Sequence, residues 1–327
     1  MNYKEHFFIS ACIFRKITLY LVSVFLLASS SFAYADLSGV YDGYLQKRAS
    51  AFLMIMGYSL TPDVTTGSLS MFDSASNTNP DLQMTSFGGG AVISDDFPLY
   101  LEGTLALNRY DPTFVASSGS STNSPLPVKW NSISGTGGIG WDFPIAQHLR
   151  FRPMFNFTLG HVESDLSLAA RYIDYKAGID LDFLKNGRLN VYGLGGSLML
   201  VYEDRLPERE IDIELRYTNI QLNSFDSSVA VSGHSSSESL GLWARRRVPT
   251  SYTIFDKTIR NVYEFAHTEY LGDMRGALGF NNLSSLGTGL EIDTTDSGIF
   301  FTRLRALLRY QFGANVRGWS VGFAASF

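Results

Sequence analysis

The sequence is poor in cysteine: Cys12 is the one residue of this type among 327. Cys12 lies in an amino-terminal segment that we expect to be removed. The mature chain would then hold no disulfide and no cysteine-based nucleophile or metal site. Positive charge is also scarce, because 26 Lys and Arg face 31 Asp and Glu, for a formal net charge of −5. This balance excludes the basic surface of nucleic-acid-binding proteins, so we predict no nucleic-acid partner.

Long apolar runs are lacking too, with one exception near the amino terminus. Lys4, Arg15 and Lys16 precede an apolar run over 17–28, and Ala33-Tyr34-Ala35 follows it before Asp36. A basic start, an apolar stretch and an Ala-x-Ala site are typical of a secretory signal peptide. We predict that residues 1–35 are a signal peptide cleaved after Ala35. The alternative, an uncleaved anchor helix, is disfavoured because a span needs about 20 apolar residues.

No apolar run of 18 residues follows residue 35, which excludes a helical membrane protein. Removing residues 1–35 leaves 23 basic and 30 acidic side chains in the mature chain. Its 292 residues, from Asp36 to Phe327, would more often form two domains in a soluble protein, whereas a membrane barrel of this size is one domain.

Apolar and polar residues alternate at every second position in most of the chain after residue 80. This is the period of a β-strand whose two faces meet different surroundings. The clearest windows are 99–108, 149–159, 173–183, 211–217, 286–293 and 300–312. Asp142-Phe143-Pro144 is predicted to be a tight turn between two strands.

The last ten residues favour a barrel over a soluble sheet, in combination with the export signal and the absence of cysteine from the mature chain. Trp319, Val321, Phe323, Ala325 and Phe327 fall on alternate positions with small residues between them, and the chain ends on the apolar face. This resembles the closing strand of bacterial outer-membrane β-barrels. The resemblance implies that barrel assembly machinery reads Phe323 and Phe327 as an assembly signal. An edge strand of a soluble sandwich is the alternative on this stretch alone.

We therefore expect an all-β fold, a transmembrane antiparallel β-barrel in the outer membrane of a Gram-negative bacterium, in contact with outer-membrane lipids. In lipid a sheet must close on itself, with polar faces inside and apolar faces toward the bilayer. Thirteen windows read as strands, and bacterial barrels have an even number, so we predict 12 strands, with 14 as the alternative. The first window is Ser50 to Leu60, and the Ser- and Thr-rich stretch Thr61 to Asn79 is predicted to be an exposed loop.

The chain resembles autotransporter translocator barrels more closely. The resemblance rests on Leu308-Arg309-Tyr310-Gln311-Phe312-Gly313, on Gly318-Trp319-Ser320-Val321-Gly322 and on the final Phe327. It implies a 12-stranded barrel over residues 49–327. Residues 36–48 are too few for a passenger domain and are predicted to be a lead-in or lumenal segment. The chain thus resembles a solitary translocator barrel without a passenger domain, and this departure from the family means that the resemblance does not extend to passenger export.

The polar strand faces carry charges that we expect to point into the lumen. They are Arg150, Arg152, Asp174, Asp180, Asp182, Glu210, Asp212, Glu214, Arg303, Arg305 and Arg309. Either these charges pair across a narrow, plugged lumen, or they line a hydrated channel and tune its selectivity. Arg245-Arg246-Arg247 breaks the alternation and is predicted to mark a strand end at the lipid headgroups.

Evidence for catalysis is weak. His234-x-Ser236 resembles the His-x-Ser of outer-membrane phospholipases, but Ser237 and Glu238 follow it where that family has Asn-Gly. We expect a structural or pore-forming barrel that is not an enzyme and has no cofactor, no catalytic residue and no metal site. The alternatives are a passive, porin-like solute channel and, second, a lipid hydrolase of barrel fold.

Overall fold

The structure is a computed structural model of the whole chain. It describes Leu53 and residues 56–60, 65–71, 81–111, 115–116, 124–125, 129–165, 188–225, 233–254, 257–276, 279–294 and 303–326. All of them belong to one compact unit, Arg48–Phe327. None of the helical segments among these residues is long and apolar enough to cross a membrane.

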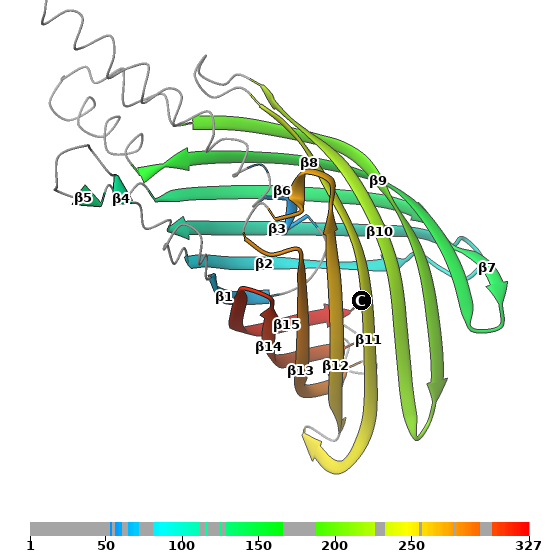
Figure 1. Cartoon of the computed structure of the whole chain (residues 1–327). Helices are drawn as coiled ribbons and strands as arrows, with labels where there is room; N and C mark the ends of the chain where they lie inside the picture. Colours follow the sequence, from blue (N-terminus) through cyan, green and yellow to red (C-terminus); the bar gives the residue numbers. More distant parts are fainter. Residues whose placement is uncertain are drawn as a thin grey trace, which may run out of the picture. The chain divides into compact units, whose positions relative to one another are not determined.

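Twelve antiparallel strands form one sheet that closes on itself (Figure 1). The strands are β1 (Thr65–Met71), β2 (Asp81–Val92), β3 (Leu99–Asp111), β6 (Trp130–Trp141), β8 (Leu149–Ser164), β9 (Arg188–Leu206), β10 (Arg209–Phe225), β11 (His234–Ile254), β12 (Lys257–Leu271), β13 (Asn282–Asp293), β14 (Arg303–Gly313) and β15 (Val316–Ser326). Each strand pairs with the next one in this order, and β7 (Phe143–Ala146) extends β6 along the edge of β8. A two-residue pair, β4 (Val115–Ala116) and β5 (Ser124–Pro125), lies apart from this sheet.

The ring closes between its first and last strands. β1 pairs with β2 on one side and with β15 on the other, so that Thr66 lies opposite both Thr85 and Val321. Figure 1 shows β1 and β15 side by side. Closure gives the backbone groups of both strands partners in the sheet, which a lipid surrounding would otherwise leave unpaired. The predicted all-β barrel with 12 strands is confirmed.

The faces of the strands are inverted relative to a soluble protein. On β3, Leu105 is 53% exposed, whereas Glu102 and Asn108 on the opposite face are 8% and 5% exposed. The same holds for Phe155 against Asn156 and for Leu308 against Arg309. Apolar side chains thus cover the outside of the ring and polar ones fill its interior, as a bilayer surrounding requires.

The prediction of a first strand in Ser50–Leu60 is wrong for the part that the structure describes. Leu53, Met56 and Gly57 are helical, and the first strand is β1, inside the stretch predicted to be a loop. The sequence of β1 is TTGSLSM, whose hydroxyl-rich composition favours a loop when considered locally. Its two neighbouring strands supply the backbone partners that override this preference.

Two further local predictions are wrong. The chain does not turn at Asp142-Phe143-Pro144 but continues into β7 and turns at residues 147–148. Arg245 and Arg247 lie within β11, not at its end, and both are buried. The predicted strand over residues 173–183 lies outside the described residues, and β8 pairs directly with β9.

Candidate functional site

The interior of the ring holds the charged residues that we consider as the candidate site. One pair joins strands that are not neighbours. The Arg216 guanidinium on β10 donates to both carboxylate oxygens of Glu102 on β3, at 2.7 and 3.0 Å. Strands β6, β8 and β9 separate β3 from β10 in the ring, so this pair must cross the interior. Arg216 also donates to the hydroxyls of Ser197 and Thr218, each at 3.0 Å, so four of its five N–H donors have partners.

A second group braces the point where β6 passes into β7. The buried Asp142 carboxylate accepts two hydrogen bonds from Arg152, one of them at 2.9 Å, and lies 3.5 Å from Arg150. Arg150 also pairs with Glu203 on β9. The Arg152 guanidinium lies 3.6 Å from the centre of the Tyr100 ring, a cation–π contact that covers its flat face. Arg152 and Asp142 therefore neutralise each other at the junction of β6 and β7.

Glu291 on β13 is the centre of the largest charge cluster. Its carboxylate is fully buried, and four guanidinium groups surround it. The distances are 3.1 Å to Arg247, 3.5 Å to Arg260, 3.6 Å to Arg305 and 3.8 Å to Arg303. One negative charge thus holds together four positive charges from β11, β12 and β14.

Two acids on β10 complete this cluster. Arg303 on β14 contacts Glu210 at 2.7 Å, although β11, β12 and β13 lie between the two strands in the ring. Arg247 contacts Glu210 at 3.1 Å and Asp212 at 2.6 Å. Strand β10 is therefore braced across the interior to β14 on one side and to β3 on the other.

Glu264 on β12 pairs with two further arginines of the interior. It accepts from Arg309 on β14 at 2.6 Å and from Arg245 on β11 at 3.1 and 3.2 Å. Arg245 in turn stacks at 3.9 Å on the ring of Trp243. With Asp293, which Arg260 contacts at 3.0 Å, the cluster joins six arginines to five carboxylates.

The residues that were predicted to face the lumen belong to these groups wherever the structure describes them and their partners. Arg150 and Arg152 lie in the Asp142 group, and the larger cluster contains Glu210, Asp212, Arg303, Arg305 and Arg309. Glu214 is half-buried on β10, between Asp212 and Arg216 on one strand face. Asp174, Asp180, Asp182 and Phe327 lie outside the described residues, and Phe323 is 58% exposed on the outside of β15. The assembly role of Phe323 and Phe327 stays a prediction.

Several charged residues of these groups were not among the residues predicted to face the lumen. They are Glu102, Arg216, Arg245, Arg247, Arg260, Glu264 and Glu291. The period-two pattern already sets Glu102 and Glu291 opposite leucines, so that signal was available. For Arg245 and Arg247 the signal was hidden, because a run of three arginines masks the alternation.

Arg305 differs from the other arginines of the cluster. It is 8% exposed, and its Nε and one Nη nitrogen have no hydrogen-bond partner. Its separation of 3.6 Å from Glu291 is too long for a hydrogen bond. Because Glu291 keeps Arg247, Arg260 and Arg303, removing Arg305 leaves no carboxylate without a cation.

We expect Arg305→Met to cost no stability, or to raise the free energy of unfolding by about 1–3 kcal/mol, since unsatisfied buried donors disappear. Urea unfolding of protein folded into lipid vesicles measures this change. Arg247→Met is the matched comparison and should be strongly destabilising, because Arg247 contacts three acids. If Arg305→Met loses as much free energy of unfolding as Arg247→Met, the prediction that Arg305 is dispensable for the cluster is wrong.

A short helical segment occupies another part of the interior. Ser59 donates to the Asn108 side chain on β3 at 3.0 Å, and the carbonyl of Gly57 accepts from Ser237 on β11 at 3.4 Å. The Tyr58 ring lies 4.3 Å from that of Tyr270 on β12. Since β3 lies far from β11 and β12 around the ring, residues 56–60 lie inside the ring.

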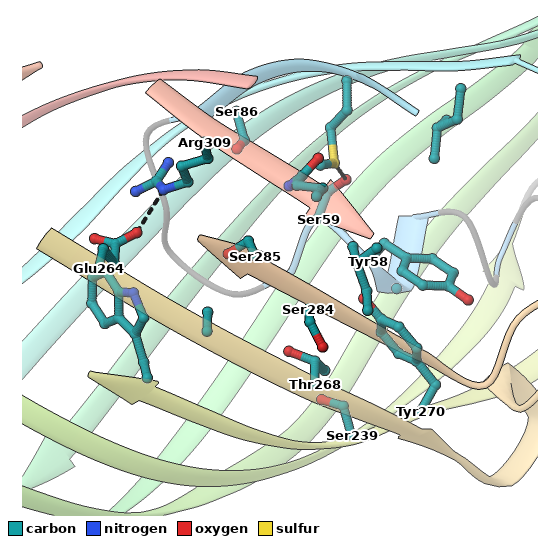
Figure 2. Close-up of a pocket in the computed structure, with 17 residues that line it drawn as sticks. Tyr58, Ser59, Ser86, Ser239, Glu264, Thr268, Tyr270, Ser284, Ser285 and Arg309 are labelled. Carbon is teal, nitrogen blue, oxygen red and sulfur yellow. Dashed lines mark hydrogen bonds and ion pairs between the residues drawn. The ribbon is translucent and has the colours of Figure 1, made fainter. Parts of the chain in front are cut away.

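A cavity of about 150 Å³ separates this segment from the charge cluster. Figure 2 shows Tyr58 and Tyr270 on one side of it and the Glu264–Arg309 pair on the other. Its lining includes the hydroxyl-bearing residues Ser86, Ser239, Thr268 and Ser285. Such a polar space is large enough for several water molecules and lies between two filled parts of the lumen.

The His234-x-Ser236 motif does not form a nucleophile and base pair. The Ser236 hydroxyl contacts Gln221 at 2.9 Å and Asn219 at 3.5 Å, and its backbone N–H donates to Asp273. None of the hydrogen bonds described for Ser236 involves His234. This candidate for lipid hydrolysis is therefore not supported.

Solved structures with this architecture include autotransporter barrels. The chain is similar to the transport unit of the autotransporter AIDA-I from Escherichia coli, with 14% identity, 86% of this chain and 99% of that chain covered, and a TM-score of 0.48. For the translocator domain of NalP from Neisseria meningitidis the identity is 13%, the coverage 91% and 98%, and the TM-score 0.42. The chain folds as an outer-membrane-type barrel.

The same architecture occurs in a porin. The structure of the KdgM porin in complex with disordered oligogalacturonate has 9% identity and a TM-score of 0.34, and 81% of this chain and 99% of that chain are covered. Neither a protein-family model nor a curated protein matches the sequence. The function of this chain must therefore be argued from its own interior.

Proposed function

We propose that this chain is an integral outer-membrane barrel with a closed lumen and a structural role, and that it is not a passive solute channel. The observation that carries the proposal is that two ion pairs connect β10 to distant strands across the interior. Arg216–Glu102 ties it to β3 and Arg303–Glu210 ties it to β14 across the interior. A hydrated pore needs an unobstructed path, whereas these pairs place side chains from separated strands within hydrogen-bond distance of one another.

Membrane insertion is supported by the outer surface. Large apolar side chains on the outside are about half exposed, such as Leu101 at 46%, Phe157 at 41%, Leu286 at 55% and Val321 at 42%. A water-soluble protein rarely exposes a continuous apolar surface of this kind. The aromatic rings of Tyr310, Phe312 and Trp319 lie together on the outside, as they do in the interfacial girdles of outer-membrane barrels.

Closure is supported by the chemistry of the interior. Most of the buried acids and arginines that the structure describes meet as pairs and clusters, which offsets the cost of burying them. The segment 56–60 fills a further part of the lumen. Both features favour the plugged interior over the selective channel that the charged strand faces also allowed.

Planar-bilayer recordings test this proposal. We expect the purified full-length barrel to insert without producing stable single-channel steps. Insertion is checked separately by quenching of tryptophan fluorescence with brominated lipid, because Trp319 is 59% exposed on the outside. Trp319→Phe is the control and should lose most of the quenching. Stable conductance steps at constant voltage from protein that is inserted would contradict the closed lumen and favour a channel.

A further inference from the structure

Two adjacent strands carry a polar group on the outside of the ring that the closed lumen does not explain. His267 on β12 lies directly opposite Ser284 on β13, and Glu269 lies directly opposite Asn282. Both pairs lie near the end of their strands, next to the connection that contains the short helix η2 (Gly272–Met274). Residues two apart on a strand share a face, so the four side chains form one group.

The side chains of this group face outward. Their neighbours Ala266, Thr268, Leu283 and Ser285 line the interior cavity, so alternation turns His267 and Ser284 the other way. Ser284 also lines the cavity (Figure 2), but its hydroxyl lies 2.8 Å from His267 Nδ1, and it is opposite the exposed Phe312, so we assign its side chain to the outward face. The His267 and Glu269 side chains are 35% and 42% exposed, so the group is accessible from outside.

The hydrogen bonds link three of these residues in series. The Ser284 hydroxyl lies 2.8 Å from His267 Nδ1, and His267 Nε2 lies 3.2 Å from Glu269 Oε1. Asn282 donates to the same Glu269 oxygen at 3.1 Å, which fixes the carboxylate. With the proton on Nε2, the imidazole donates to Glu269 and accepts from the Ser284 hydroxyl. A hydroxyl, an imidazole and a carboxylate in this order are the parts of an activated serine nucleophile.

The surroundings show what this serine could reach. Phe312 on β14 is opposite Ser284 and is 37% exposed, and its ring stacks on Tyr310 at 5.9 Å. Toward the middle of the strands the next outward residues are Phe265 and Leu286, at 38% and 55% exposure. The group thus lies at the border between the apolar belt and the polar strand ends. In a bilayer, this border is the level at which the ester bonds of lipids lie.

We propose that Ser284, His267 and Glu269 form a hydrolytic site for the acyl esters of membrane lipids on the outer face of the barrel. Ser284 Oγ attacks the ester carbonyl while His267 Nδ1 takes its proton. The tetrahedral intermediate collapses, the C–O bond to the lipid alcohol breaks, and His267 returns the proton to the leaving oxygen. Water, deprotonated by His267, then attacks the acyl-serine carbonyl. The bond between the acyl carbon and Ser284 Oγ breaks, the fatty acid is released, and His267 returns the proton to Ser284 Oγ. Glu269 is a positioning residue that orients the imidazole and stabilises its charged form.

The test uses the full-length barrel in detergent micelles with phosphatidylcholine that carries a fluorescent acyl chain. We expect fatty-acid release above that of protein-free micelles, and a loss of at least about 1,000-fold in Ser284→Ala and His267→Asn. Glu269→Gln should lower kcat by about 10- to 1,000-fold at an unchanged KM, which a merely structural role would not produce. Ser285→Ala, the same change one residue away on the inward face, should keep the wild-type rate.

A second measurement does not depend on turnover. A fluorophosphonate probe should label the wild-type protein at Ser284, as identified by peptide mass spectrometry, and should fail to label His267→Asn. Heat-modifiable migration in gels verifies that each variant is folded. Wild-type protein without lipid hydrolysis or labelling, or full activity in Ser284→Ala, would overturn the proposal. Hydrolysis of the water-soluble p-nitrophenyl acetate without hydrolysis of the lipid would overturn the assignment to lipid esters.

Discussion

Glu291→Gln is expected to lower the free energy of unfolding by about 3–5 kcal/mol. The substitution keeps the shape of the side chain and removes its charge. Four arginines, Arg247, Arg260, Arg303 and Arg305, would then lie together without the fully buried carboxylate that they share. Like charges in a surrounding of low dielectric constant repel strongly, so the folded state loses more than one ion pair.

Urea titration of protein folded reversibly into lipid vesicles measures this loss. Glu208→Gln is the matched control, because Glu208 is exposed in the turn between β9 and β10, and it should change stability by less than about 0.5 kcal/mol. Equal, small effects at the two positions would mean that water screens the cluster around Glu291. A hydrated lumen would then replace the closed one.

Leu308→Arg is expected to cost about 2–4 kcal/mol, because the substitution carries a guanidinium into the middle of the apolar belt. Leu308 is the central residue of β14 and is 48% exposed on its outer face. Leu304 shares this face but lies one residue from the start of the strand, so Leu304→Arg should cost only about 0–1 kcal/mol. The same vesicle titration gives both numbers.

The difference between the two sites is the informative quantity. A penalty that depends on depth arises from the bilayer, whereas lost packing against neighbouring side chains would not follow the position along the strand. If Leu308→Arg is as stable as the wild type, the outer face does not meet lipid and the membrane barrel is wrong. If both variants lose the same large amount, the belt extends beyond the end of β14.

Local sequence was sufficient for most strand faces and insufficient for several segments, of which two show the reason. The alternation of β3, β8, β10 and β14 correctly divided outward leucines and phenylalanines from inward polar residues. It failed at β1, where hydroxyl-rich residues favour a loop, and in the predicted first strand, where the described residues Leu53, Met56 and Gly57 are helical. In both segments the deciding contacts come from residues far away in the chain, which a local pattern does not contain.

For the candidate site, too, the sequence predicted which face a residue lies on but not which partner it contacts. Arg305, Arg309 and Glu210 could be assigned to the lumen from their strand faces, but their partners could not. Glu210 meets Arg303 across 93 positions of sequence, and Ser284 meets His267 across 17. The first contact depends on the closure of the ring and the second on the register of β12 against β13. No single segment encodes either of them.

The sequence by itself determined that the strands have one apolar and one polar face, because side chains alternate across every strand whatever its neighbours are. It also determined that a closed antiparallel barrel is the suitable fold, because strands in a lipid surrounding can pair all of their backbone groups only in a closed sheet. Only the tertiary structure decided which charges meet. A charge inside the ring can choose among several strands that face it, and the choice follows from ring closure, strand register and side-chain length together.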